Sequence, residues 1–323
     1  MTPSKPSASA SLALRVHGLR KAFGDVVAVD GLDLEVQPGE CFGLLGPNGA
    51  GKTTTIEVCE GLTAPDQGEV EVLGHTWRED GDGLRQRLGI QLQETQLAEK
   101  LTVEETLRLF RSFYRRGRDV SDVIALVQLD EKRRARVGTL SGGQKQRLAL
   151  GCALVGEPDL VFLDEPTTGL DPQARRQVWE LIEQLKATGR TILLTTHYMD
   201  EAERLCDRVA IVDHGRNIAL GTPRQLIAGL GAEQIVSFAV EEAMAGGLDD
   251  AVLEAVAAAV RATHPARATE TGWELPVAAT HEAIPALLAE LDRRGLPLSE
   301  LRTHLPTLED VFVSLTGRAL RDA

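Results

Sequence analysis

The sequence predicts an α/β protein with a parallel central sheet and an antiparallel β layer beside it. Strands of a parallel sheet are covered on both faces, so they read as nearly continuous apolar runs. Such runs occur at Cys41–Leu45, Leu160–Leu163 and Thr191–Thr196. Leu32–Val36 and Glu69–Val72 instead alternate between apolar and polar residues. That alternation is typical of half-buried strands and predicts the antiparallel layer near the start of the chain.

A helical subdomain is expected at about residues 82–155, inserted into the α/β core. Charged helical stretches dominate this region, and Thr102–Arg116 carries large apolar side chains at the spacing of one helix face. Thr102, followed three positions later by Glu105, fits a capping box. The box predicts that this helix begins just after Thr102.

The length of 323 residues favours two domains. Residues 1–11 are rich in Ser, Pro and Ala and are predicted to be a flexible tail. Residues 12–221 form the expected α/β core, and residues 222–323, rich in Ala, Leu and Glu, form a small α+β accessory domain. The expected elements of that domain are a strand at Ile235–Val240, a helix with Val252, Ala255, Val256, Ala259 and Val260 on one face, a strand at Glu274–Val277, and a helix with Ile284, Leu287, Leu288 and Leu291 on one face that stops at Gly295.

Charge and hydropathy exclude several kinds of protein. The net charge of −13 repels phosphate backbones, so a general nucleic-acid-binding protein is not expected. No run reaches the roughly 18 apolar residues that cross a bilayer, and the start lacks the apolar core of a secretion signal. Any role at a membrane therefore requires a partner. The four cysteines are expected to be reduced core thiols, because none forms a CxxC pair.

A phosphate-binding loop follows the first apolar run. Gly46–Thr53 fits G-x-x-x-x-G-K-[ST], and its position after a strand is the context that the motif requires. Lys52 is expected to reach the β- and γ-phosphates, and the Thr53 hydroxyl to bind Mg²⁺. The fold is therefore predicted to be that of a P-loop NTPase. The residues expected to surround the nucleotide are Gly46, Pro47, Asn48, Gly49, Ala50, Gly51, Lys52, Thr53 and Thr54.

Acidic and imidazole side chains close the other two apolar runs. Asp164 ends one run and is expected in the coordination sphere of the magnesium ion. Glu165, next along the chain, is the candidate general base that polarises the attacking water. His197 ends the other run, so it lies on the ligand-binding rim of a parallel sheet. There it would hydrogen-bond the γ-phosphate and distinguish ATP from ADP.

The stretch Ser141-Gly142-Gly143-Gln144 predicts that a second subunit completes the site. Ser141 suits the N-cap of a helix, and the two glycines permit close approach of a phosphate. The segment between Lys52 and Ser141 is filled mostly by the expected helical insert. We therefore expect Ser141 to contact the nucleotide of a partner rather than the one held by its own chain.

Taken together, these motifs resemble those of the ATP-binding subunit of an ABC transporter, over roughly Leu12–Gly221. The resemblance implies an ABC ATPase core that hydrolyses ATP with Mg²⁺ and a head-to-tail homodimer with two ATP molecules between the subunits. It also implies that Asp171, in Gly169-Leu170-Asp171, touches the opposite subunit. Phe23 would be the aromatic residue that stacks on adenine, although a core role explains it equally well.

The resemblance also implies a glutamine that binds magnesium and couples the site to the membrane. Gln93 fits this role, and the nearby Gln91 is the alternative, because the usual proline is missing before the glutamine. The tail, with Pro306–Phe312 and Leu315–Arg318, resembles ATPases of the ABC-2 export group, in particular daunorubicin-resistance exporters. That likeness implies a separately encoded integral-membrane permease, with this chain held at the cytoplasmic face of the membrane and not inserted in it.

Two other functions fit parts of the pattern. A soluble ABC-type ATPase acting on ribosomes or DNA shares the motifs, but such proteins usually carry two cassettes or a long coiled-coil insert. A regulatory ATP sensor without turnover would not need both Glu165 and His197. The accessory domain at residues 222–323 is either a passive support for the dimer or a regulatory domain.

Overall fold

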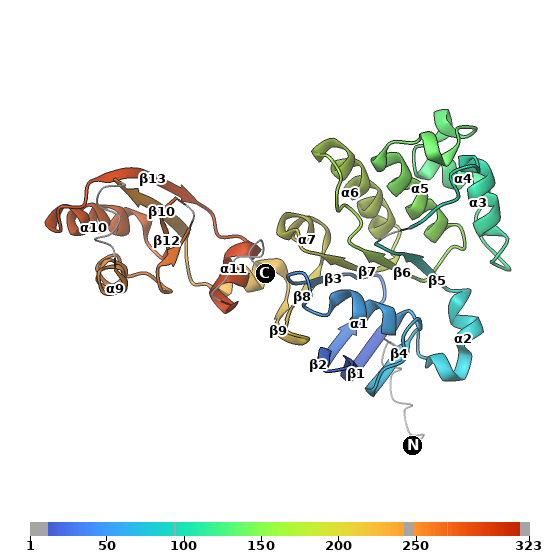
Figure 1. Ribbon diagram of the computed structural model, residues 1–323, viewed down its shortest axis with the longest axis horizontal. Helices are drawn as coiled ribbons and strands as arrows, with labels where there is room; N and C mark the ends of the chain where they lie inside the picture. Colours follow the sequence, from blue (N-terminus) through green and yellow to red (C-terminus); the bar gives the residue numbers. More distant parts are fainter. Residues whose placement is uncertain (1–11, 94, 242–248, 270, 317–323) are drawn as a thin grey trace, which may run out of the picture. The chain divides into compact units, whose positions relative to one another are not determined.

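The computed structural model of the chain describes residues 12–93, 95–241, 249–269 and 271–316. The chain divides into two compact units, Met1–Leu220 and Gly221–Ala323 (Figure 1). The predicted flexible tail at residues 1–11 lies outside the described residues. None of the helices in the described residues is long and apolar enough to cross a membrane.

A six-stranded sheet forms the centre of the first unit, in the order β5-β6-β7-β3-β8-β9. The pairs β5–β6, β6–β7, β7–β3 and β3–β8 are all parallel. The three continuous apolar runs are strands of this sheet, as predicted, and every residue of β3, β6 and β7 is buried. The strand bounds are β3 Cys41–Leu45, β5 Leu88–Gln91, β6 Leu160–Asp164, β7 Thr191–Thr196, β8 Arg208–Asp213 and β9 Arg216–Gly221.

One of these strands lies inside the region expected to be helical. Residues 88–91 form β5, at the edge of the parallel sheet, with Leu88 paired to Leu160 and Gln91 to Leu163. Leu88-Gly89-Ile90-Gln91 is neither a continuous apolar run nor a strict alternation, so tertiary pairing with β6 determines this element. The region predicted to be helical, at about residues 82–155, therefore includes one strand of the parallel sheet.

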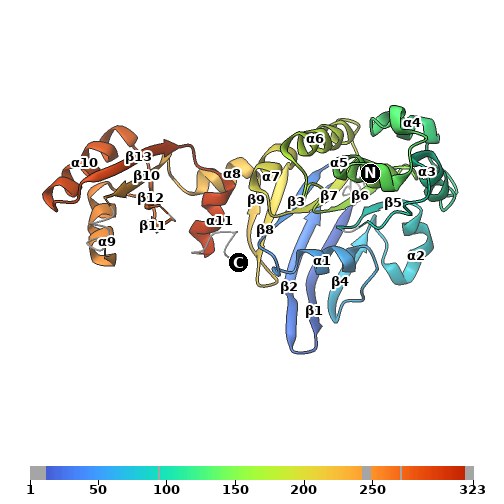
Figure 2. The same cartoon turned by 45° about the horizontal axis from the view of Figure 1, so that its top comes forward.

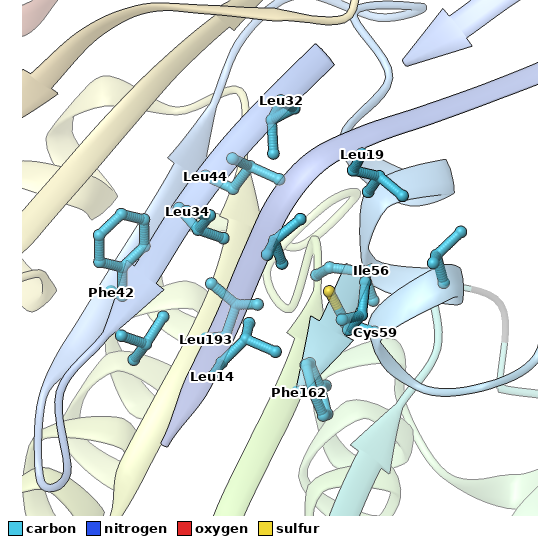
Figure 3. Packing of buried hydrophobic residues seen from close by; sticks show 14 of the residues in the cluster. Leu14, Leu19, Leu32, Leu34, Phe42, Leu44, Ile56, Cys59, Phe162 and Leu193 are labelled. Carbon is cyan, nitrogen blue, oxygen red and sulfur yellow. The ribbon is translucent and has the colours of Figure 1, made fainter. Parts of the chain in front are cut away.

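The antiparallel layer is confirmed. Its sheet has the order β2-β1-β4, with β1 at Leu14–Phe23, β2 at Val26–Val36 and β4 at Gln67–Val72. At the start of β1, Leu14 and Val16 are buried and Arg15 and His17 exposed, and the strand register shifts before Leu19. Inward-facing leucines of this layer meet the parallel sheet and helix α1 in one core, shown in Figure 3 by Leu14, Leu19, Leu32, Leu34, Phe42, Leu44, Ile56, Cys59, Phe162 and Leu193.

Helices complete the first unit. The antiparallel layer and α1 cover one face of the parallel sheet, and α5, α6 and α7 lie on the other (Figure 1). Their bounds are α1 Lys52–Cys59, α2 Trp77–Arg85, α3 Val103–Arg111, α4 Val120–Leu126, α5 Gly142–Leu154, α6 Pro172–Ala187 and α7 Met199–Leu205, with short 3₁₀ turns at Asp130–Lys132 and Val137–Thr139. All four cysteines are buried and free, as expected for core thiols.

The predicted capping box is present at the start of α3. The Thr102 Oγ1 accepts a hydrogen bond from the Glu105 N–H at 3.2 Å, and the Glu105 carboxylate accepts one from the Thr102 N–H at 2.8 Å. The helix is shorter than predicted, because it ends at Arg111 rather than Arg116. The Arg111 guanidinium donates to the Tyr114 carbonyl at 2.8 Å, which stabilises a turn in place of a further helical turn.

The second unit is an α+β domain built on an antiparallel sheet of order β11-β12-β10-β13 (Figure 2). Helices α9 and α10 contribute Val256, Leu287 and Leu291 to one core with Val236 and Leu275 of the sheet. The bounds are α8 Pro223–Gly229, β10 Gln234–Val240, α9 Asp250–Ala259, β11 Arg267–Ala268, β12 Trp273–Val277, α10 Thr280–Arg293, β13 Leu298–His304 and α11 Leu308–Thr316.

The sequence missed two strands of this unit, the two-residue β11 and the edge strand β13, and misplaced one helix residue. Edge strand β13 is mostly solvent-exposed and polar, so it lacks the apolar pattern that identifies a strand. Leu288 was expected on the inner face of α10, but it is 43% exposed. The buried face instead follows Ala283, Leu287 and Leu291, which lie four residues apart along the helix.

Candidate active site

The phosphate-binding loop joins β3 to α1 at the carboxyl end of the parallel sheet. Gly51 is the residue before α1 and has a φ of 98°, a conformation that L side chains rarely adopt. A Cβ at this position would also lie 2.2 Å from the Ala28 carbonyl oxygen of β2. Only glycine fits at this position. Since Ala28 belongs to β2, the antiparallel layer lies directly beside the phosphate-binding loop.

Lys52 lies across this loop and is almost completely buried. Its Nζ donates hydrogen bonds to the carbonyl oxygens of Gly46 at 2.9 Å and Pro47 at 3.0 Å. The Nζ is also 3.7 Å from the Glu165 Oε1. Burial lowers the pKa of Lys52, and the negative charges of Glu165 and Asp164 oppose that shift. A phosphate oxygen would be a stronger partner for this ammonium group than the two neutral carbonyls.

Asp164 ends β6 and is 3% exposed. It accepts a short hydrogen bond from the Thr195 hydroxyl, because Thr195 is its register partner on β7. Burial raises the pKa of Asp164, while hydrogen bonds from Thr195 and Thr53 lower it and the charge of Glu165 raises it. A buried carboxylate beside another acid is costly unless a cation balances it. Its environment therefore suits a cation ligand.

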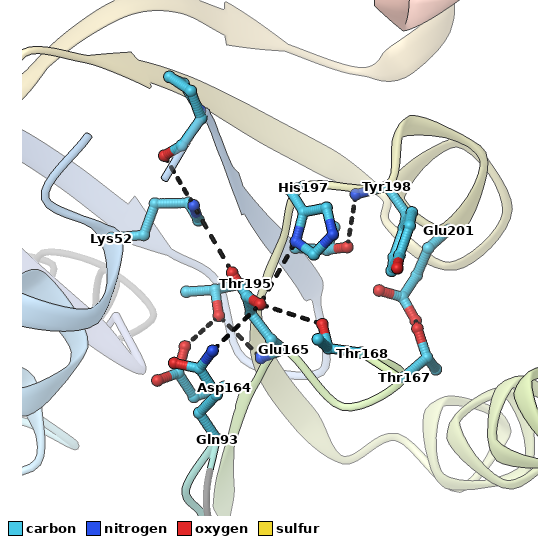
Figure 4. Close-up of polar contacts among 12 residues, drawn as sticks. Lys52, Gln93, Asp164, Glu165, Thr167, Thr168, Thr195, His197, Tyr198 and Glu201 are labelled. Carbon is cyan, nitrogen blue, oxygen red and sulfur yellow. Dashed lines mark hydrogen bonds and ion pairs between the residues drawn. The ribbon is translucent and has the colours of Figure 1, made fainter. Parts of the chain in front are cut away.

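Glu165 lies at the centre of the polar contacts (Figure 4). Its Oε2 accepts hydrogen bonds from Thr168 Oγ1 at 3.0 Å and Gln93 Nε2 at 3.4 Å, and lies 3.3 Å from His197 Nδ1. The contact with His197 is the largest cause that lowers the pKa of Glu165, and burial opposes it. The carboxylate is therefore ionised at neutral pH and is able to accept a proton.

His197 and one of the two candidate glutamines contact Glu165. His197 follows β7, with its side chain 28% exposed, so its ring faces both Glu165 and the solvent. Gln91 is 1% exposed on β5, and its side-chain amide has no hydrogen-bond partner among the described residues. Gln93 is exposed and reaches Glu165. Of the two candidate glutamines, Gln93 is the one that touches this cluster.

The donors around Asp164 fit a magnesium ion. Mg²⁺ prefers oxygen ligands, and it is usually held by one or two carboxylates together with phosphate oxygens and water. Asp164, the Thr53 hydroxyl and the side-chain amide of Gln93 supply such oxygens. No group of three or more His, Cys, Asp or Glu residues in the described part of the chain could hold a metal ion by itself. This donor set suits an ion that arrives with a phosphate ligand.

Ser141 and Asp171 both cap helices. Ser141 precedes α5, where its hydroxyl accepts from the Gln144 N–H at 3.3 Å and its N–H donates to Gln144 Oε1 at 3.0 Å. Asp171 Oδ1 accepts from the N–H groups of Gln173 and Ala174, both at 2.9 Å, at the start of α6. Both are exposed, as is Gly142, and the hydrogen bonds described here hold each of them to its own helix.

Close packing explains one glycine of the same stretch. A Cβ at Gly143 would lie 2.7 Å from the Cβ of Ala174, so α5 and α6 approach too closely here for a larger residue.

Phe23 lies at the end of β1 and is 52% exposed, which excludes a core position. The Lys21 Nζ is 5.4 Å from the centre of its ring. An exposed aromatic face remains available for stacking.

Two residues of the site, Thr195 and Thr168, were not identified from the sequence. Thr195 donates to Asp164 and accepts from the Glu165 N–H at 3.0 Å, and Thr168 contacts the Glu165 carboxylate. Thr195 was identified only as part of an apolar run. Its role depends on β6 and β7 being neighbours, and strand order is not visible in the sequence.

Comparison with known proteins identifies the family. A profile described as "ABC transporter" matches residues 29–168. The Nod factor export ATP-binding protein I of Cupriavidus metallidurans is 40% identical over 96% of this chain and 99% of that protein. The linearmycin resistance ATP-binding protein LnrL of Bacillus subtilis is 36% identical over 96% of this chain and 100% of that protein. These relatives therefore span both units.

Solved structures agree with this assignment. A structure titled as the ATP-binding subunit of an ABC transporter has a TM-score of 0.62 and 32% identity, over 68% of this chain and 94% of that one. The cbiO1 protein of Clostridium perfringens, part of an ABC transporter complex, has a TM-score of 0.61 and 28% identity, over 67% of this chain and 91% of that one. The chain belongs to the ABC transporter family, as an ATP-binding subunit with ATPase activity.

Proposed function

We propose that this chain is the motor subunit of an ABC-2 type exporter and drives a separate integral-membrane permease from the cytoplasmic face of the membrane. The export and resistance proteins named above support this, because the chain matches nearly their full length. The described residues contain no helix able to cross a bilayer, so the proposal assigns the membrane path to the permease. The net charge of −13 argues against a nucleic-acid partner.

Glu165 is the proposed general base, and the contacts of its carboxylate carry the proposal. The group is buried, its pKa is lowered, and it lies between Lys52 and His197. It would take a proton from the attacking water, while Lys52 holds the β- and γ-phosphates and His197 hydrogen-bonds the γ-phosphate. Asp164, Thr53 and Gln93 would hold Mg²⁺, which supplies positive charge to the phosphate oxygens when bound.

Two copies of the chain are proposed to share two ATP molecules. Residues Ser141–Gln144 of one copy would contact the phosphates held by the loop Gly46–Thr54 of the other. The exposed position of Ser141 at the start of α5 supports this, because a helix N-terminus favours an anion. Asp171 would touch the opposite copy, and Phe23 would stack on the adenine. Residues 12–221 are assigned to the cassette and 222–323 to an accessory domain.

An exposed apolar strip near the end of α3 is proposed to contact the permease. Leu109 and Phe113, four residues apart, are 45% and 61% exposed. Phe113 also stacks edge to face on Phe110, with ring centres 5.9 Å apart, which holds it in place. Contiguous exposed apolar surface marks contact sites for other proteins.

Steady-state phosphate release by the purified chain, alone and in complex with the permease, tests the function. We expect ATP hydrolysis by the chain and a changed rate in the complex. Phe113→Gln should weaken the effect of the permease and leave the basal rate intact, whereas Leu62→Gln, at another exposed apolar residue, should change neither. An unchanged rate with the permease bound would contradict the proposed coupling.

A further inference from the structure

Glu201 is a buried acid that the proposed mechanism does not use. It lies on α7 and has a relative exposure of 0%. Its Oε1 accepts hydrogen bonds from Thr167 Oγ1 and from Trp179 Nε1, both at 2.8 Å. Thr167 belongs to the loop after β6, and Trp179 to α6. One carboxylate oxygen therefore joins the loop after β6, α6 and α7.

The position carries a cost that packing alone does not explain. Burial raises the pKa of Glu201, and hydrogen bonds with Thr196, Thr167 and Trp179 oppose that rise only in part. An apolar side chain of similar volume would avoid that cost if the site served only to fill space. The two hydrogen bonds on Oε1 are therefore the feature that needs a carboxylate or an amide here.

The first of these bonds fixes the loop that carries Glu165. Thr167 is two residues beyond Glu165, and its neighbour Thr168 donates to Glu165 Oε2 at 3.0 Å. Glu165 itself has a φ of 47°, an uncommon backbone conformation that its surroundings must maintain. On the other side of the loop, Gln146 Nε2 of α5 donates to the Pro166 carbonyl at 2.7 Å. The loop is thus held between α5 and α7.

Glu201 is also connected to His197, through the start of α7, and to α6, through Trp179. Helix α7 begins at Met199, two residues after His197, so a shift of Glu201 would move the histidine as well. The second bond, to Trp179, connects the carboxylate to the helix that Asp171 caps. Glu165, His197 and Asp171 are therefore all attached to elements that meet at this one group.

We propose that Glu201 is a positioning residue that keeps Glu165 in contact with His197 and connects this pair to the subunit interface at Asp171. This inference rests on the proposed roles of those three residues. A loss of the bond to Thr167 would release the Glu165 loop, and a misplacement of about 1 Å is enough to slow catalysis about 100-fold.

Substitutions at Glu201 test this inference in the full-length chain. Glu201→Gln keeps an acceptor at Oε1 and should keep the turnover rate within about twofold of the unsubstituted protein. Glu201→Leu removes both bonds and should lower kcat about 10- to 100-fold, with little change in the Kd for ATP. Glu203→Leu makes the same chemical change at an exposed site on α7 and should leave kcat unchanged.

A purely structural role would lower the melting temperature and the yield of folded protein, but not kcat per folded molecule. If Glu201→Leu fails to fold, Thr167→Val replaces it, because this variant removes one hydrogen bond and keeps the side-chain volume. Normal kcat in a folded Glu201→Leu, or in Thr167→Val, overturns the inference.

A double variant that combines Glu201→Leu with Glu165→Gln distinguishes a failure of this inference from a failure of the proposed function. If Glu201 acts through Glu165, the double variant Glu165→Gln/Glu201→Leu should hydrolyse ATP no more slowly than Glu165→Gln alone. It should also form fewer ATP-dependent dimers, because Asp171 is affected. A normal rate in Glu165→Gln would refute the proposed base, whereas a slow Glu165→Gln with strictly additive losses would refute only the role of Glu201.

Discussion

The Nζ of Lys52 lies 3.7 Å from the Oε1 of Glu165, and both side chains are almost completely buried. The lysine comes from the phosphate-binding loop and the glutamate from the end of β6, so the contact places the proposed base beside the phosphate site. Each group also balances the charge of the other, since an unpaired buried charge is costly. Substitution of either residue should therefore leave the other without its buried counter-charge.

Removal of the Glu165 charge should separate binding from hydrolysis. We expect Glu165→Gln to bind ATP but to hydrolyse it at least about 100 times more slowly, because the amide accepts no proton from water. ATP-bound dimers should then accumulate, which size-exclusion chromatography detects. Glu180→Gln makes the same change at an exposed position on α6 and should behave like the unsubstituted protein. Phosphate release at the normal rate by Glu165→Gln would show that another group is the base.

Ser141 offers a test of the shared site that leaves its helix intact. Asp and Asn cap helices about as well as Ser, so neither Ser141→Asp nor Ser141→Asn should destabilise α5. Only the aspartate places a negative charge against the phosphates of a partner. In the Glu165→Gln background, we expect Ser141→Asn to dimerise with ATP and Ser141→Asp to remain monomeric. Equal dimerisation of the two variants would mean that Ser141 does not face the nucleotide.

The buried carboxyl group of Glu60 is expected to make the free energy of unfolding depend on pH. The residue is 2% exposed, and neither carboxylate oxygen has a hydrogen-bond partner within the described residues. Burial, with the charges of Asp164 and Glu57, raises its pKa from 4.5 to about 8. Between these values the unfolded chain has lost the proton and the folded protein keeps it. The contribution of Glu60 to stability therefore falls as pH rises, by about 1.4 kcal/mol per pH unit.

Urea denaturation at pH 6 and pH 8 measures this effect. Glu60→Gln has no carboxyl proton to release, so its free energy of unfolding should exceed that of the unsubstituted protein by more at pH 8 than at pH 6. Glu69→Gln, at an exposed position on β4, should show the same pH dependence as the unsubstituted protein. A constant difference between Glu60→Gln and the unsubstituted protein at the two pH values would rule out a titrating Glu60.

The core of the second unit provides a packing test. Leu287 is 0% exposed on α10, whereas the adjacent Leu288 is 43% exposed. Leu287→Ala should destabilise this unit by about 2 to 5 kcal/mol, because the cavity adds to the lost apolar burial. Leu288→Ala should cost much less. Fluorescence of Trp273, which packs against this core, reports the unfolding once Trp77 and Trp179 are replaced by Phe. Equal losses for the two leucines would contradict the observed orientation of α10.

Local sequence was enough to predict the strands that carry the site. An uninterrupted apolar run requires cover on both faces, and the runs ending at Leu45, Leu163 and Thr196 all proved to be strands of the parallel sheet. The capping box at Thr102 was equally visible, because its two partners are three residues apart. By contrast, β5 and the polar edge strand β13 were missed, since neither has a continuous apolar run or a strict alternation of apolar and polar residues.

The sequence by itself determined the family and the residue types of the candidate active site, because the motifs that identify them are short and continuous. The tertiary structure decided which residues meet. The sheet order places β7 between β6 and β3. As a result, Thr195 contacts Asp164 and His197 contacts Glu165. Lys52, which follows β3, also lies beside Glu165. It also selected Gln93 over Gln91 for the contact with Glu165 and revealed Glu201 beneath the loop. These contacts depend on the pairing of distant strands, which no local pattern encodes.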